Sequence, residues 1–213
     1  AAVVSHDVAT PLGVIENNAR LVEMTGDPSH AEDIFEATDR IQELIDDLLE
    51  LARAGRWVGE IEPVEFEAIA RRTWGSIDDP GATMTVESST RLEANPDRLR
   101  QLLENLLRNA VEHGSTGGAA EPHAAEHGST AGDLRVRVGT LPDGFYVADD
   151  GPGIPEADRG QVFDAGYSAT DGGTGFGLNI VQRVADAHGW EIGVTESEAG
   201  GARFEITGVT TGV

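Results

Sequence analysis

The amino-acid sequence predicts an α+β protein in which an N-terminal antiparallel helical hairpin precedes an α/β sandwich domain. Three observations support this fold class. Apolar residues recur at helical spacing through the first fifty-odd residues, helical and strand-like segments mix from Pro63 onward, and a glycine-containing stretch separates the two regions. We therefore expect a first domain at residues 1–57, a linker at residues 58–62 and a second domain at residues 63–213.

The first domain carries a seam of apolar or small residues on each of two predicted helices. Alternating steps of four and three residues join Val4, Val8, Pro11, Ile15, Asn18 and Val22, and similar steps join Ile34, Thr38, Ile41, Ile45, Leu48 and Ala52. Gly26 and Pro28 separate the helices, and Ser29 is expected to cap the second one. Since a lone hairpin cannot bury a two-sided seam, we expect a homodimer that forms a four-helix bundle.

The second domain mixes both kinds of element. Amphipathic periodicity predicts helices at residues 66–74, from Asn95-Pro96 to about His113, and at residues 178–187. Alternation predicts strands at residues 83–87, 133–139, 144–148, 190–195 and 202–207. Helices and strands in this order indicate a sandwich of helices on a sheet.

Composition narrows the classes of function. Asp and Glu number 38 against 15 basic residues, all of them Arg, for a formal charge of −23. Such a surface repels nucleic acid and anionic membranes, so we expect contact with neither. The absence of Lys and the dispersed carboxylates resemble haloarchaeal proteins and indicate adaptation to high salt. Cys is absent and no apolar run approaches the ~20 residues that span a bilayer, so we expect a cytoplasmic location.

His6 lies midway between the seam positions Val4 and Val8, on the opposite side of the predicted helix. Alone it is an ordinary surface histidine, but Asp7 is adjacent and Thr10 lies one turn further on. An imidazole can attack phosphorus through one ring nitrogen if a carboxylate holds the proton on the other. His6, Asp7 and Thr10 thus offer a nucleophile, an orienting base and a hydroxyl that can position water.

The stretch SHDVATPL at residues 5–12 closely resembles the H box of histidine kinases. The resemblance implies that His6 is autophosphorylated, that Asp7 assists the transfer, and that Thr10 supports dephosphorylation of the partner regulator. The downstream stretch NLLRNA at residues 105–110 resembles the N box of the same family, in which the second amide ligates Mg²⁺ on the ATP phosphates. Asn105 and Asn109 share one helix face, and Asn109 is the implied metal ligand.

Two glycine-rich stretches complete the resemblance. The first, DDGPGIP at residues 149–155, follows a predicted strand and resembles the box whose leading Asp accepts a hydrogen bond from the adenine amino group. Asp149 takes that place, with Gly151 and Gly153 allowing close approach of the backbone. The second, GGTGFGL at residues 172–178, opens a helix where backbone N–H groups favour phosphate. Its expected nucleotide contacts are Gly173, Thr174, Gly175, Gly177 and Leu178.

Two departures from the family pattern concern the phosphates. Glu112 and His113 stand where the N box usually continues with Lys and an aromatic residue, which leaves His113 as a candidate contact to phosphate or ribose. The segment expected to form the lid over ATP, residues 164–172, contains neither Arg nor Lys. Phosphate binding is therefore expected to depend on backbone amides, Mg²⁺ and hydroxyl groups.

Together the motifs imply the core of a two-component sensor histidine kinase, a fragment of a longer sensor protein. The resemblance implies Mg-ATP-dependent autophosphorylation of His6 and transfer to an aspartate of a response-regulator receiver domain. It also implies a sandwich of the gyrase, chaperone and histidine-kinase type. Two alternatives stay open: a non-catalytic dimeric scaffold or nucleotide sensor, and an ATP-hydrolysing clamp of the gyrase type. The clamp would require a glutamate at the position of Asn105 to activate water.

Overall fold

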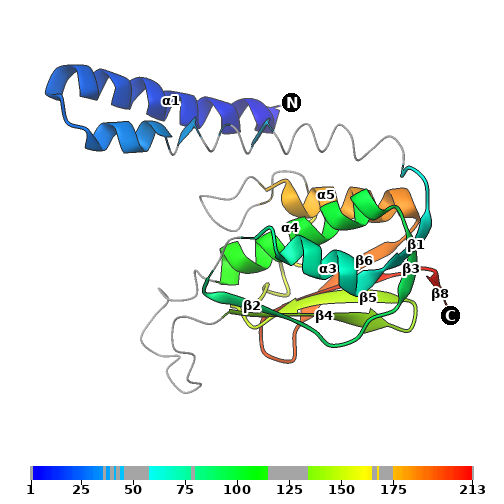
Figure 1. Cartoon of the computed structure of the whole chain (residues 1–213). Coiled ribbons are helices and arrows are strands. Elements are labelled where there is room, and N and C mark those ends of the chain that lie inside the picture. Colours follow the sequence, from blue (N-terminus) through cyan, green and yellow to red (C-terminus); the bar gives the residue numbers. More distant parts are fainter. Residues whose placement is uncertain are drawn as a thin grey trace.

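The computed structural model describes residues 2–35, 37–38, 41, 44–45, 58–77, 80–114, 134–164, 167 and 175–212, with the side chains of residues 2–8 left out of the description. It contains a helical N-terminal part and a mixed α/β part (Figure 1). The predicted fold class is confirmed. None of the described helices is long and apolar enough to cross a membrane.

The N-terminal part begins with α1 (Ala2–Thr25), which ends at Gly26 with a φ of 67°. The described residues of the following helix, between 29 and 45, run back along α1 (Figure 1). Asp27 caps this second helix, because its Oδ1 accepts the backbone N–H of Ser29 at 3.0 Å. The prediction that Ser29 is the cap was wrong: Ser29 is already helical, and the capping side chain is that of Asp27 before it.

Some positions of the two predicted seams are buried and others are exposed. On α1 the structure buries Pro11 and Asn18 and partly buries Ile15 and Val22, as predicted. On the second helix it buries Ala37 and Leu44, whereas Ile45 is 43% exposed and Thr38 is also exposed. Pairing of two helices within one chain covers only one side of a wide apolar stripe, and the other side stays uncovered. The seam positions Val4, Val8, Leu48 and Ala52 lie outside the described side chains.

The second part is built on a five-stranded sheet of order β2-β4-β5-β7-β6. Its strands are β2 (Ala82–Val86), β4 (Leu134–Leu141), β5 (Gly144–Asp149), β6 (Glu191–Glu196) and β7 (Ala202–Thr207). Only the β2–β4 pair is parallel. Three helices lie on one side of this sheet (Figure 1): α3 (Phe66–Trp74), α4 (Pro96–Gly114) and α5 (Gly177–His188). The predicted helices and strands of this part are all present.

A second, three-stranded sheet of order β1-β3-β8, which the sequence did not predict, is also present. Its strands are short: β1 (Glu62–Glu65), β3 (Arg91–Ala94) and β8 (Thr211–Gly212). Val64 and Leu92 from this sheet are buried in the same core as the helices. The sheet therefore joins the start of the second part to the end of the chain.

The core lies between the helices and the five-stranded sheet. From α4 it receives Leu99, Leu102, Leu103, Leu106, Leu107 and Ala110, from α5 it receives Ile180, Val181, Val184 and Ala185, and from the strands it receives Val136, Val138, Phe145, Val147, Phe204 and Ile206. Burial of a large aliphatic side chain contributes roughly 1.5–3 kcal/mol. Because one face of α4 is buried in the core, its polar residues lie on the opposite side of the helix.

Candidate functional site

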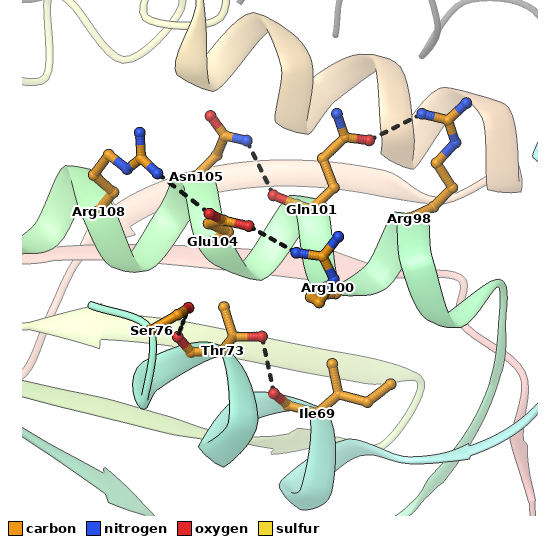
Figure 2. A network of polar contacts seen from close by, with 9 residues as sticks. All are labelled: Ile69, Thr73, Ser76, Arg98, Arg100, Gln101, Glu104, Asn105 and Arg108. Atoms are coloured by element: carbon orange, nitrogen blue, oxygen red, sulfur yellow. Dashed lines mark hydrogen bonds and ion pairs between the residues drawn. The ribbon is translucent and has the colours of Figure 1, made fainter. Parts of the chain in front are cut away.

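Helix α4 carries the two asparagines on the side that faces α5. Asn105 donates from Nδ2 to the backbone O of Gln101 at 3.0 Å, which fixes the orientation of its amide. Figure 2 shows Asn105 and Gln101 on this side of α4. On a different side, Glu104 bridges Arg100 and Arg108 at 3.1 and 3.2 Å. These exposed pairs stabilise the helix only slightly and take no part in the site.

The start of α5 meets both asparagines at Gly177. A Cβ atom on Gly177 would lie 3.2 Å from Oδ1 of Asn105 and 3.3 Å from Oδ1 of Asn109. Both amide oxygens therefore converge on the first turn of α5. The first N–H groups of a helix have no intrahelical acceptor, and α5 has no side-chain cap at its N-terminus. Two amide oxygens and a helix N-terminus thus meet at one point, an arrangement suited to a magnesium-bound phosphate group.

Asp149 ends β5 and is buried, with a relative exposure of 7%. Its Oδ1 accepts the backbone N–H of Gly151 at 2.9 Å and that of Ala202 at 3.1 Å. Burial raises the pKa of this carboxyl, while the two backbone hydrogen bonds act in the opposite direction. Both hydrogen bonds use Oδ1, so Oδ2 is the atom that remains to accept a ligand donor.

Glycines let the backbone close in around Asp149. A Cβ on Gly151 would lie 3.1 Å from Oδ1 of Asp149 and 3.1 Å from Cα of Gly114, the last residue of α4. Gly153 has a φ of 73° and its Cβ would lie 2.9 Å from the backbone O of Gly200. The end of α4, the end of β5 and the loop before β7 therefore meet at Asp149.

His113 lies in the last turn of α4 and is partly buried. Burial is the main cause that raises the pKa of Asp149, and the charge of His113 acts in the opposite direction. His113 is therefore close enough to Asp149 to interact with it electrostatically. Along α4, Asn105 and His113 are eight residues and so about 12 Å apart, so the helix carries one polar group of the site near its middle and another near its end.

The remaining predicted residues are placed as follows. Gly175 and Leu178 lie at the start of α5 and are partly buried, and Gly175 has a φ of 69°. Gly173 and Thr174 lie outside the described residues, as does most of the predicted lid at residues 164–172. His6 and Asp7 are in α1, and their side chains are among those not described. Thr10 is exposed on the same helix.

The structure also shows partners of the site that the sequence analysis missed. Ser197 and Gly201 contact Asp149, and Asn179 donates from Nδ2 to the backbone O of Phe163 at 2.9 Å. The contact of Asn179 connects α5 to the segment that contains Phe163. For the contact of Gly201 with Asp149, the sequence offered one signal, the adjacent glycines 200 and 201 between two predicted strands.

Comparison with known proteins identifies the class. Residues 94–209 match the family described as histidine kinase-, DNA gyrase B-, and HSP90-like ATPase, and residues 1–56 match the His Kinase A (phospho-acceptor) domain. The chain belongs to this ATPase family, and its second part is an ATP-binding domain. A phospho-acceptor domain followed by this ATPase domain is the transmitter core of a histidine kinase.

Individual relatives agree with this assignment. The chain is 27% identical over 229 residues to the circadian input-output histidine kinase CikA of Synechococcus elongatus, covering 96% of this chain and 29% of that protein. It is 30% identical over 213 residues to the sensory histidine kinase/phosphatase NtrB of Klebsiella oxytoca, covering 95% of this chain and 59% of that protein. The chain therefore spans only part of the length of these relatives.

Solved structures show the same fold. Full-length ShkA in complex with AMPPNP superposes with a TM-score of 0.63 and 28% identity, covering all of this chain (100%) and 46% of that one. The histidine kinase AdeS of Acinetobacter baumannii superposes with a TM-score of 0.68 over 97% of both chains, and at 19% identity this likeness concerns the fold alone.

Proposed function

We propose that the second domain binds Mg-ATP along α4 and that its γ-phosphoryl group is transferred to His6. The observation that carries this proposal is the convergence of both amide oxygens on Gly177 at one end of the site and the buried Asp149 carboxylate at the other. The domain boundaries that we propose are residues 1–57 for phosphotransfer, 58–62 for the linker and 63–213 for ATP binding, although β1 already begins at Glu62.

Each end of the site has a distinct role in this proposal. Asp149 accepts a hydrogen bond from the adenine amino group through Oδ2, and Gly151 and Gly153 let the backbone approach the base. Asn109 is the protein ligand of Mg²⁺, with Asn105 beside it, and His113 contacts ribose or phosphate. Bound Mg²⁺ would neutralise charge on the phosphates, and an amide oxygen suits such a hard cation. Gly173, Thr174, Gly175, Gly177 and Leu178 hold the phosphates through backbone amides and a hydroxyl.

Transfer requires the ATP domain to bring the γ-phosphate to the imidazole of His6. One ring nitrogen of His6 forms a bond to phosphorus as the bond to the leaving ADP oxygen breaks, and Asp7 holds the proton on the other ring nitrogen. Positioning and charge neutralisation supply most of the rate enhancement in such a reaction. Asn105 is an amide and cannot act as the general base of a hydrolytic clamp, which argues against the gyrase-type alternative.

Two partners follow from the proposal. The exposed apolar side chains of the helical part, Leu12 at 47%, Met24 at 82%, Phe35 at 68% and Ile45 at 43%, support burial against a second copy in a four-helix bundle. An aspartate of a response-regulator receiver domain accepts the phosphoryl group from His6. Thr10, which lies at an exposed position of α1, then supports a regulator phosphatase activity, an activity that the name of NtrB also records for that relative.

We further propose that the chain works at high salt and comes from a haloarchaeal source. The formal charge of −23 with Arg as the sole basic type besides His supports this, since dispersed carboxylates repel one another at low ionic strength. Salt should therefore be present at molar concentration in every assay of this chain.

The test is incubation of the chain with γ-labelled ATP and Mg²⁺ in molar KCl. We expect an acid-labile and base-stable label that is absent from the His6→Gln variant. Label that persists in His6→Gln would refute the assignment of His6. Steady ATP turnover without any label would favour a clamp, and the absence of ATP binding would favour a scaffold.

A further inference from the structure

The turn between β6 and β7 is connected to Asp149 through Ser197. The hydroxyl of Ser197 donates to the backbone O of Asp149 at 2.6 Å. The same oxygen accepts the backbone N–H of Gly201 at 3.1 Å and that of Ala199 at 3.2 Å. Ser197 is buried, with a relative exposure of 5%. One hydroxyl therefore joins the turn to the end of β5.

A second group of contacts holds the carboxylate of Asp149 from the same direction. The backbone N–H of Ala202, the first residue of β7, donates to Oδ1 at 3.1 Å. Gly201 lies directly against Asp149, because a Cβ there would overlap both Oδ1 and the backbone O of Asp149. The turn thus contacts the main chain and the side chain of one residue at once.

These contacts restrict how Asp149 presents its second oxygen. The hydrogen bond from Ser197 fixes the peptide plane that follows Asp149, and the hydrogen bonds from Gly151 and Ala202 fix Oδ1. With the backbone and one oxygen held, rotation of the carboxylate would break two hydrogen bonds. The direction of Oδ2 is therefore set by the turn as well as by β5 itself.

A purely local role would not require the contact with Asp149. The N–H groups of Ala199 and Gly201 already engage the oxygen of Ser197 in the way that serines stabilise turns. The proton of the hydroxyl is the part that reaches across to another strand, 48 positions away in sequence. Donation of that proton to the backbone O of Asp149 is how Ser197 can position Asp149.

We propose that Ser197 is a positioning residue for adenine recognition, acting by holding Asp149 in the orientation that accepts the amino group. This proposal rests on the proposed role of Asp149. Removal of the hydroxyl leaves the phosphate end of the site unchanged. It should therefore weaken recognition of the amino group and leave binding of the rest of the nucleotide intact.

The experiment compares ATP with purine riboside triphosphate, which lacks the amino group, by measuring both dissociation constants in molar KCl. We expect Ser197→Ala to reduce the preference for ATP by about fivefold to tenfold, the usual effect of one lost hydrogen bond. Ser76→Ala is the matched control, because the hydroxyl of Ser76 also donates to a backbone carbonyl at 2.6 Å, but to that of Thr73 (Figure 2). This control should retain the full preference.

Two further variants separate the possible failures. Asp149→Asn should abolish the preference for ATP, and an Asp149→Asn variant that keeps it would overturn the proposed adenine contact. If Asp149→Asn loses the preference while Ser197→Ala keeps it, the role of Ser197 is overturned alone. Should Ser197→Ala fail to fold, Ser197→Cys keeps the volume with a weaker donor and should show a smaller loss of the same sign. Full preference in a folded Ser197→Cys would count against the proposal.

Discussion

Replacement of Gly177 by alanine should separate stability from nucleotide binding. The added Cβ would lie 3.2 Å from Oδ1 of Asn105 and 3.3 Å from Oδ1 of Asn109, closer than ordinary van der Waals contact. The end of each amide must therefore shift by a few tenths of an ångström. Binding of Mg-ATP would bring the amides back toward the added Cβ, and an off-rotamer amide costs about 0.5–1.5 kcal/mol, which corresponds to a loss of about twofold to tenfold in affinity.

The free energy of unfolding of the same variant should change little. Gly177 is in a helix and its φ is not among the positive values, so alanine fits its backbone and contributes about 0.5–1 kcal/mol, which offsets the cost of shifting the two amides. Titration calorimetry and thermal unfolding of one preparation measure both quantities. Gly13→Ala is the matched control, since Gly13 is also helical and nothing lies within 4 Å of its Cβ. Unchanged Mg-ATP affinity in Gly177→Ala would refute the proposed role of the two amides.

Three other variants test separate parts of the structure. Asn95→Ala should lower the free energy of unfolding by about 1 kcal/mol, because Oδ1 of Asn95 accepts the N–H of Arg98 at 3.0 Å as a helix cap. Asn95→Asp keeps that cap and loses only the donation to the backbone O of Glu60, so chemical denaturation should show a smaller change. Asp149→Asn should lose the preference for ATP and leave the protein as stable or more stable at neutral pH, because burial raises the pKa of Asp149 and its charge is costly there. A large drop in melting temperature would contradict this expectation. Burial lowers the pKa of His188 from its ordinary value of 6.5, so the unfolded chain binds more protons just below that pH. Stability should therefore fall as the pH drops below about 6.5, and the wild type should lose more than His188→Gln across that range; equal slopes would contradict the assignment.

The sequence predicted the longer elements because their patterns are local. Helix α4 shows its apolar face and its Asn-Pro start within nineteen residues, and the five main strands alternate or lie beside clear turns. The three-stranded sheet was missed because its strands have only two to four residues and pair across the chain, as Leu92 does with Thr211. Such pairing depends on the tertiary fold and leaves no local periodicity.

The sequence predicted those residues of the candidate site that belong to a recognisable motif. Asn105, Asn109 and Asp149 were predicted as site residues from their neighbours in sequence, and the convergence of Asn105 and Asn109 on Gly177 is what the structure adds. Ser197 was not found, because its contact with Asp149 arises from the antiparallel pairing of β5 with β7. A turn serine has no sequence signature that distinguishes this role.

In the proposed reaction, His6 receives the γ-phosphoryl group from ATP bound at α4. The most direct measurement maps the phosphorylated residue by mass spectrometry after incubation of the intact chain with Mg-ATP in molar KCl, quenched at alkaline pH. We predict a single phosphoryl group on His6 and none in the Asn109→Ala variant. A phosphoryl group on another of the six histidines, such as His30 or His188, or undiminished labelling in Asn109→Ala, would contradict the account.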